Sequence, residues 1–201
     1  GFPLDRQVML ARCRAWLVHQ GTSQPIGPDS LARLGFDYDS RSCWEYHVPV
    51  GRGRTVVLSV ALELVAGENL LRIHFHRHRA ADSPDVLEDG SPVRLILRPD
   101  VEDRSFHETT KAFAGPEKAW PAAVSAGRQG FTFSPQPPRR LEMLCEAGEF
   151  VVEPEWQYMV HRPIEARRGL DPDSDLFSPG WFRVPLTGGQ TATLTAHVTA
   201  E

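Results

Sequence analysis

The chain has 201 residues, of which 41% are hydrophobic, and carries a formal net charge of −4. This balance argues against nucleic acid as the main partner, because phosphate binding needs a net basic face. No apolar run approaches the roughly 20 residues of a membrane-spanning helix, and no signal peptide precedes the first expected strand, so we expect no membrane association.

The minor residue types narrow the class of protein further. The 17 prolines and 16 glycines predict frequent turns, which are typical of many short strands. Cys13, Cys43 and Cys145 are few and widely spaced. They form neither a disulfide framework nor a zinc pattern, so we expect a cytoplasmic location.

Alternation of apolar and polar residues predicts the strands in chain order. We expect them at residues 8–18 (a short helix being the alternative), 43–50, 55–65, 70–78, 93–98, 130–133, 140–145, 149–153, 182–186 and 190–199. Short helical pieces are expected near residues 31–34 and 109–113, and an irregular connection over residues 114–130. The prediction is an all-β fold, a two-sheet antiparallel β-sandwich in one domain spanning residues 1–201.

Details of single strands follow from the same pattern. Pro49 places the strand at residues 43–50 on a sheet edge. In the strand at residues 55–65 the expected buried side chains are Val56, Leu58, Val60, Leu62 and Leu64. Leu71, Ile73 and Phe75 face inward in the next strand. Residues 182–186 and 190–199 are expected to form a last hairpin around the turn at 187–189.

Residues 156–182 hold the densest set of functional residue types. Pro163, Pro172 and Pro179 restrict the backbone, and Gly169 and Gly180 permit turns. We therefore interpret the segment as a long ordered loop, held by ion pairs between its acids (Glu165, Asp171, Asp173, Asp175) and its arginines (Arg162, Arg167, Arg168) or by carboxylates that accept backbone N–H bonds. Leu170, Leu176 and Phe177 would anchor it in the sandwich.

This segment resembles a signature of the N-terminal, non-catalytic domain of bacterial and archaeal-type glycogen debranching enzymes, the amylo-α-1,6-glucosidase family. The matching residues are Trp156, Tyr158, Pro163, Glu165, Arg168, Gly169, Leu170, Asp171, Asp175, Leu176, Phe177, Pro179 and Gly180. A second passage, at residues 97–112, is similar to another family motif through Arg98, Pro99, Arg104, His107 and Thr109 or Thr110. The family's usual opening passage, T-R-x-Y-H-G-L-L, has no match here.

The resemblance implies a function for the protein to which the domain belongs. Such a protein hydrolyses the 1,6-linked glucose stub of α-glucans without a cofactor, and its catalytic carboxylates lie in a following (α/α)₆ barrel. The implied partners of this chain are that C-terminal catalytic domain of the same polypeptide and an α-glucan such as glycogen. A free-standing α-glucan-binding module is the alternative, and a self-contained sandwich enzyme is a third reading.

Two other groups of residues, the histidines at 74–78 and the acids of residues 156–182, have both a chemical and a structural interpretation. His74, His76 and His78 share one strand face and would suit zinc, but neighbouring Arg72 opposes a cation, so we expect no metal site. Glycosidic hydrolysis needs two carboxylates about 5 to 10 Å apart across the bond. The acids of residues 156–182 are instead interpreted as structural, because neighbouring arginines lower carboxyl pKa values.

Aromatic rings could stack on sugar faces, but we interpret most of them as packing in the sandwich core or at the contact with a neighbouring domain. We assign no catalytic residue, no metal ligand and no cofactor. The residues expected to bind substrate or to meet a neighbouring domain are Arg104, His107, Trp156, Tyr158, Glu165, Arg168, Asp175 and Trp181.

Overall fold

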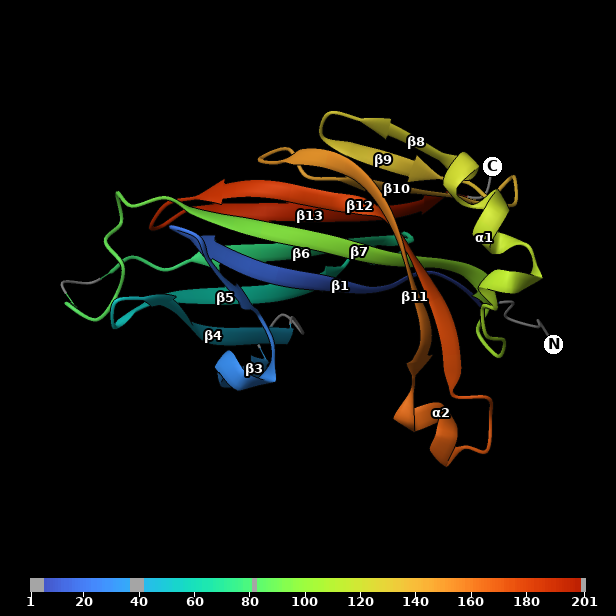
Figure 1. Ribbon diagram of the computed structural model, residues 1–201, viewed down its shortest axis with the longest axis horizontal. Helices are drawn as coiled ribbons and strands as arrows, with labels where there is room; N and C mark the ends of the chain where they lie inside the picture. The colour runs from blue at the N-terminus through green and yellow to red at the C-terminus, as the bar shows by residue number, and fades with distance from the viewer. Residues whose placement is uncertain (1–5, 37–41, 81–82, 200–201) are drawn as a thin grey trace.

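The computed structural model describes residues 6–36, 42–80 and 83–199, which form two antiparallel sheets (Figure 1). The first sheet has the order β11 (Glu149–His161), β12 (Asp173–Leu186), β7 (Val93–Ser105), β1 (Gln7–His19) and β2 (Thr22–Pro25). The second has the order β3 (Leu31–Phe36), β4 (Ser42–Gly51), β5 (Arg54–Leu64), β6 (Leu70–Arg77), β13 (Thr191–Thr199), β10 (Arg140–Leu144), β9 (Gly130–Phe133) and β8 (Val124–Gly127). The predicted all-β class and two-sheet architecture are therefore confirmed.

Helical structure is confined to short pieces: the 3₁₀ turns η1 (Pro28–Ser30), η2 (Ala112–Ala114) and η3 (Pro121–Ala123) and the helices α1 (Pro116–Ala119) and α2 (Pro163–Arg167). Most of them lie where a long strand ends or where the chain passes between elements. No helix within the described ranges is long and apolar enough to cross a membrane.

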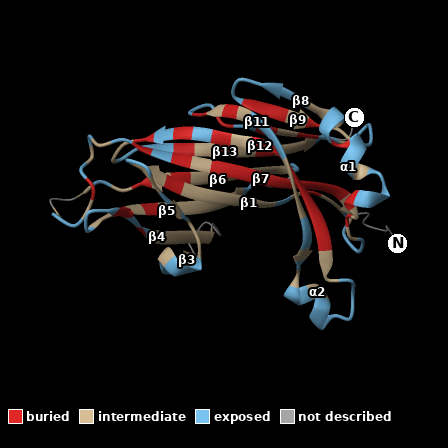
Figure 2. Cartoon of the chain, in the orientation of Figure 1, coloured by how far each residue is buried: buried red, intermediate tan, exposed pale blue. Residues whose placement is uncertain are grey.

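The core lies between the two sheets and is built from alternate residues of each strand (Figure 2). In β7, Val93, Leu95 and Leu97 are buried, whereas Arg94 between the first two of them is exposed. Aromatic rings fill one region of this core, where Phe150 contacts both Phe131 and Phe182 with ring centroids 4.8 and 5.0 Å apart. Cys145 is also buried there as a free thiol, and burial raises its pKa to about 11.

Several predicted elements are wrong in type or position. Residues 31–34 are not helical, because β3 pairs with β4 along its length after the turn at η1. This tertiary pairing overrides the weak local preference for helix. The helical piece expected near residues 109–113 lies slightly later, as η2, and the connection after it contains α1, η3 and the strand β8.

The edge and face assignments of two strands also need correction. β4 is not an edge strand, since β3 pairs with its residues 42–46, but Pro49 lies beyond the end of β3 and has only β5 beside it. Proline is tolerated there because only one neighbour needs its backbone. Leu64 ends β5 with 81% of its surface exposed, so the buried face of that strand stops before it.

The last two strands do not form a hairpin. β12 pairs with β11 and β7 in the five-stranded sheet, whereas β13 pairs with β6 and β10 in the eight-stranded sheet. The turn at residues 187–190 therefore carries the chain from one sheet to the other. Its backbone is fixed by N–H bonds from Gly188 to Asp89 and from Gly189 to Arg77.

Arg77 occupies a core-facing position of β6 where the pattern of that strand calls for an apolar residue. Its side chain is 1% exposed and donates to four backbone carbonyls, those of Leu87, Glu88, Ser91 and Leu186. Because buried carbonyls without a donor are costly, this guanidinium ties the connection between β6 and β7 to the end of β12.

We predict that Arg77→Met lowers the free energy of unfolding by about 3 kcal/mol, since it leaves buried carbonyls without donors. Urea denaturation followed by circular dichroism measures the change. Arg52→Ala, in the exposed turn between β4 and β5, is the control and changes stability by less than about 0.5 kcal/mol. Equal midpoints for both variants would show that the carbonyl bonds of Arg77 add no net stability.

Candidate functional site

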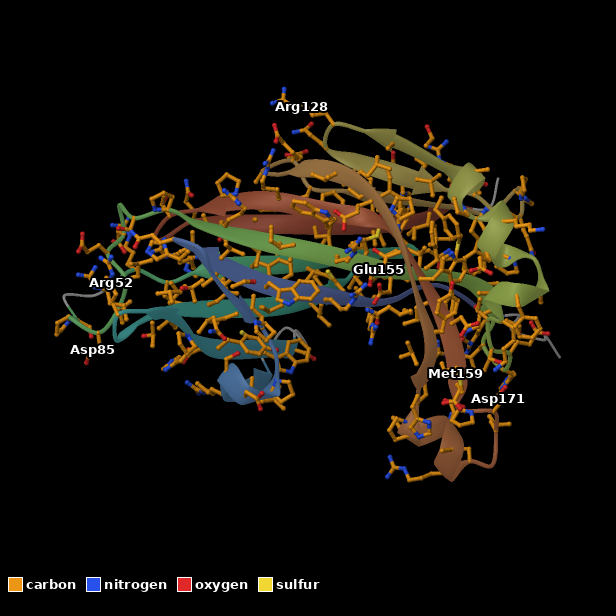
Figure 3. The ribbon with its side chains drawn as sticks, in the orientation of Figure 1. Arg52, Asp85, Arg128, Glu155, Met159 and Asp171 are labelled. Atoms are coloured by element: carbon orange, nitrogen blue, oxygen red, sulfur yellow. The ribbon has the colours of Figure 1, made fainter. Side chains whose placement is uncertain are left out.

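The segment at residues 156–182 is not a loop but the outer part of a long hairpin. β11 and β12 run past the end of the sandwich and carry α2 where they meet, with Met159 and Asp171 near this far end (Figure 3). We call this part, residues 156–178, the arm. Leu176 and Phe177 are buried as expected, whereas Leu170 is 42% exposed and does not anchor the arm.

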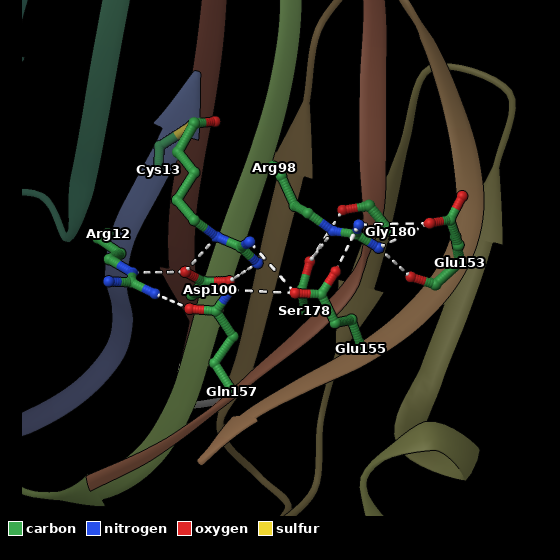
Figure 4. A network of polar contacts seen from close by, with 10 residues as sticks. Arg12, Cys13, Arg98, Asp100, Glu153, Glu155, Gln157, Ser178 and Gly180 are labelled. Carbon is green, nitrogen blue, oxygen red and sulfur yellow. Dashed lines mark hydrogen bonds and ion pairs between the residues drawn. The ribbon is translucent and has the colours of Figure 1, made fainter. Parts of the chain in front are cut away.

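Charged residues alternate along the outer face of β7 and connect the arm to the sheet (Figure 4). Asp100 is fully buried and accepts bonds from Arg12 at 2.6 Å and from Arg14 at 2.8 Å. Arg98, in the same row, donates to Ser178 and pairs with Glu155 at 2.7 Å. A buried charge is tolerated only when it is paired and hydrogen-bonded, which these contacts achieve.

Glu102 fixes the arm close to α2. Its carboxylate has no exposed surface and is contacted by Arg104 at 3.0 Å and by Arg162, the residue before α2. Two hydroxyl groups donate to the same oxygen: Ser174 at 2.7 Å and Thr110 at 3.1 Å. One carboxylate therefore joins β7, both sides of the arm and the segment that follows β7.

Asp175 fixes the outer side of the arm without any arginine. One carboxylate oxygen accepts the backbone N–H of Met159 at 2.8 Å, and the other accepts that of Ala112 at 2.8 Å. The residue is 6% exposed. Of the two roles foreseen for this acid, the structure shows the acceptor of backbone N–H bonds.

Exposed apolar residues lie at or next to both backbone donors of this carboxylate. Phe113, next to Ala112, is 83% exposed; Met159 is 72% exposed and Tyr158 is 55% exposed. Met159 also has a φ of 52°, in the left-handed region that is unfavourable for a non-glycine residue. We call these three residues the arm patch, and Asp175 holds the two segments that carry it side by side.

The predicted aromatic residues divide between packing and surface. Trp156 is half-buried and stacks on Trp120, with ring centroids 5.4 Å apart, which agrees with a filling role. Tyr158 lies over Trp156 and donates its hydroxyl to Glu117 at 2.6 Å, a bond that raises the pKa of the phenol. Trp181 lies on the opposite, outer face of the sheet and donates to Glu153 at 2.9 Å.

Of the remaining predicted residues, Arg104 and Glu165 line one hollow of about 440 Å³, whereas His107 and Arg168 are not among its lining residues. Arg104 is committed to Glu102 and to the carbonyls of Ser105 and Phe106, while His107 is exposed beside the ring of Phe106. Glu165 of α2 forms an ion pair with Arg168, the residue after this helix, at 3.5 Å, and the Arg168 side chain is 56% exposed. The expectation that Arg168 helps to hold the segment by ion pairs is not supported by this geometry.

His74 and His76 of β6 and His78 just after it bond to different partners, although the rings of His76 and His78 meet edge to face with centroids 5.0 Å apart. His74 and His76 bond to Thr193 and Thr191 of β13, and His78 bonds to Ser59 of β5. Within the described part of the chain no group of three or more His, Cys, Asp or Glu is placed to hold a metal ion.

Sequence reasoning missed four of the residues that hold the arm and the sheet together: Arg12, Arg14, Asp100 and Glu102. Arg162 was expected to form an ion pair, but its partner Glu102 lies outside the segment. A signal existed, because charges recur at every second position in both β1 and β7, as they do on one face of a strand. Their burial could not be foreseen, since a charged strand face usually faces solvent.

We predict that Asp175→Ala lowers the free energy of unfolding by about 3 kcal/mol, because two backbone N–H groups lose a charged acceptor. Arg168→Ala is the matched test of the ion-pair interpretation and changes stability by less than about 0.5 kcal/mol, as exposed pairs do. Chemical denaturation of both variants measures this. A larger loss for Arg168→Ala than for Asp175→Ala would contradict the assignment of the two roles.

A family model described as the N-terminal part of glycogen debranching enzyme matches residues 2–193. The match extends through the first half of the chain, where the motifs quoted above gave no support. No curated protein sequence matches the chain significantly. The extent of the family match shows that the chain belongs to the family of glycogen debranching enzyme N-terminal domains.

Proposed function

We propose that the chain is the accessory β-sandwich domain of a glycogen debranching enzyme and that it docks, through the arm patch, on a catalytic domain in the same polypeptide. The family supports a debranching enzyme as the parent protein. In the family that the chain resembles, the catalytic carboxylates are expected in a following (α/α)₆ barrel, so on this proposal the chain supports that barrel and, through it, the substrate cleft.

The arm patch is the observation that carries the proposal. Exposed apolar clusters on soluble domains mark contact surfaces more often than scattered apolar residues do. Here the cluster is also ordered: one buried carboxylate bonds to both segments, and Met159 is kept in an unfavourable backbone conformation. Order in the free domain reduces the entropy lost on docking.

The carboxyl groups support an accessory role as well. A general acid in glycoside hydrolysis needs a raised pKa. Among the described residues, the carboxyl groups whose pKa is displaced are all displaced downward, and hydrogen bonds from neighbouring side chains contribute in each case; they are Glu149, Glu153, Glu155 and Asp171. The most deeply buried acids, Asp100 and Glu102, are held by arginines.

We predict that the isolated chain releases no glucose from a phosphorylase limit dextrin. The reason is that its most deeply buried carboxylates, those of Asp100 and Glu102, are held by arginines in structural contacts. Glucose release by the purified chain is the measurement. Turnover that disappears in a Glu165→Gln variant would show instead that the arm itself is catalytic.

Docking is tested by removing apolar surface from the arm patch in the complete polypeptide. We predict that Phe113→Ser leaves the stability of the isolated chain within about 0.5 kcal/mol of the original, because the ring is mostly exposed. In the complete polypeptide the same change lowers the melting temperature, because the ring is buried against the catalytic domain there. Differential scanning calorimetry of both forms gives the comparison.

Leu144→Ser is the matched control for this experiment. Leu144 ends β10 with 40% of its surface exposed and pairs with Gly130, at the end of the sandwich away from the arm. Its substitution affects the isolated and the complete protein equally. The docking proposal fails if Phe113→Ser also affects both forms equally.

A further inference from the structure

Three arginines from separate elements surround one hollow at the end of the sandwich away from the arm. Arg94 lies at the start of β7, Arg183 on β12 and Arg128 in the turn between β8 and β9. The hollow measures about 650 Å³, and the turn at residues 146–149 forms another of its walls. Figure 3 shows Arg128 far from Met159, so this hollow is separate from the arm patch.

Glu149 holds two of the guanidinium groups at the hollow. It accepts a bond from Arg183 at 2.7 Å and a longer one from Arg128 at 3.4 Å. These bonds, the one from Arg183 first, lower the pKa of the Glu149 carboxyl.

The wall that carries Glu149 is itself fixed. A Cβ on Gly148 would lie 2.9 Å from the Val184 side chain and 3.2 Å from the Arg183 carbonyl, so the backbone of the turn packs directly against β12. The position of Glu149 relative to Arg183 is therefore set by the fold and not by a flexible loop.

Arg94 supplies positive charge without a protein counter-ion. Its side chain is exposed, and its neighbours across the sheet are Val18 and Pro185. No ion pair or hydrogen bond of its side chain occurs within the described ranges. The hollow is therefore lined by three guanidinium groups and only two carboxylates, those of Glu146 and Glu149. This local excess of positive charge contrasts with the net charge of −4 of the whole chain.

We propose that this hollow binds a phosphate monoester, carried by a free sugar phosphate or by a phosphorylated glucan. Planar guanidinium groups match the oxygens of a phosphate, and several of them around one hollow suit a dianion better than a single carboxylate. Arg94 and Arg183 contact the phosphoryl oxygens. Glu146 lies on the same hollow as an acceptor for sugar hydroxyl groups. The inference does not depend on the docking proposal, because no residue of the arm lines this hollow.

The first test is titration of the full chain with glucose 6-phosphate and with inorganic phosphate at constant ionic strength, followed by NMR. Saturable binding is expected, with shifts confined to residues around the hollow. Arg94→Ala and Arg183→Ala each weaken it by about tenfold or more, as expected for the loss of a bond to a charged group. Glu149→Gln strengthens it, because a competing negative charge is removed.

Arg72→Ala is the charge-matched control, since Arg72 is 40% exposed and pairs with Glu63 on the eight-stranded sheet. Its affinity for glucose 6-phosphate stays unchanged. Unsaturable binding, or equal weakening by Arg72→Ala and Arg94→Ala, would overturn the proposal, as would weaker binding in Glu149→Gln. Arg94→Ala is expected to keep the fold, because the Arg94 side chain is exposed and forms no hydrogen bond or ion pair with any residue that the structure describes, and circular dichroism verifies this.

The source of the phosphoryl group is distinguished by a second pair of probes. A phosphorylated starch glucan and the same glucan after phosphatase treatment are compared at equal mass. Tighter binding of the phosphorylated glucan than of glucose 6-phosphate assigns a glucan ester, and the reverse order assigns a free sugar phosphate. Equal binding of the treated and untreated glucan, together with no binding of glucose 6-phosphate, would contradict the site.

Discussion

The functional account depends on the two hydrogen bonds that the Asp175 carboxylate accepts from the backbone N–H groups of Ala112 and Met159. They connect a segment after β7 to the arm, two regions that share no strand pairing at that point. Because the carboxylate is buried, water cannot take the place of a lost N–H donor. Loss of either hydrogen bond therefore leaves a carboxylate oxygen and a backbone N–H without a partner. Of the exposed apolar residues around it, Met159 is held through its own backbone N–H, and Phe113 through that of the neighbouring Ala112.

Behind this contact lies a row of buried charges on the outer face of β7. Replacing buried ion pairs by apolar residues often costs no stability, so their presence is weak evidence for stability itself. Their geometry has a clearer consequence. Asp100 and Glu102 bind arginines from β1, β7 and the arm, so the arm leaves the sheet in one defined direction. We infer that orientation of the arm is the main role of these pairs.

The sequence predicted the fold class and most strands because alternation in strands such as β5 and β7 reflects burial directly. It failed where proline and glycine were taken to mark a loop. Pro179 and Gly180 lie inside β12, at an irregularity in its pairing with β7, and a Cβ on Gly180 would lie 2.1 Å from the Val151 carbonyl. There the two residues mark a distorted strand and a close backbone contact.

The partners of the buried charges were beyond the sequence for a different reason. Arg12 and Asp100 are 88 positions apart, and Arg162 and Glu102 are 60 apart. Local spacing can suggest an ion pair such as that of Glu165 and Arg168, which forms but is exposed. Spacing cannot show whether such a pair stabilises the fold more or less than a pair between distant residues. The sequence identified Asp175 as an acid that holds the segment, but only the folded structure shows which two backbone N–H groups donate to it.

Hydrogen–deuterium exchange, compared between the isolated chain and the complete polypeptide, tests the central claim most directly. In the isolated chain, the amides of Ala112 and Met159 exchange slowly, because Asp175 accepts both. In the complete polypeptide, amides at residues 112–114 and 158–160 gain further protection, since the catalytic domain covers the arm patch. Unchanged exchange at these residues, with new protection elsewhere on the sandwich, would contradict the account.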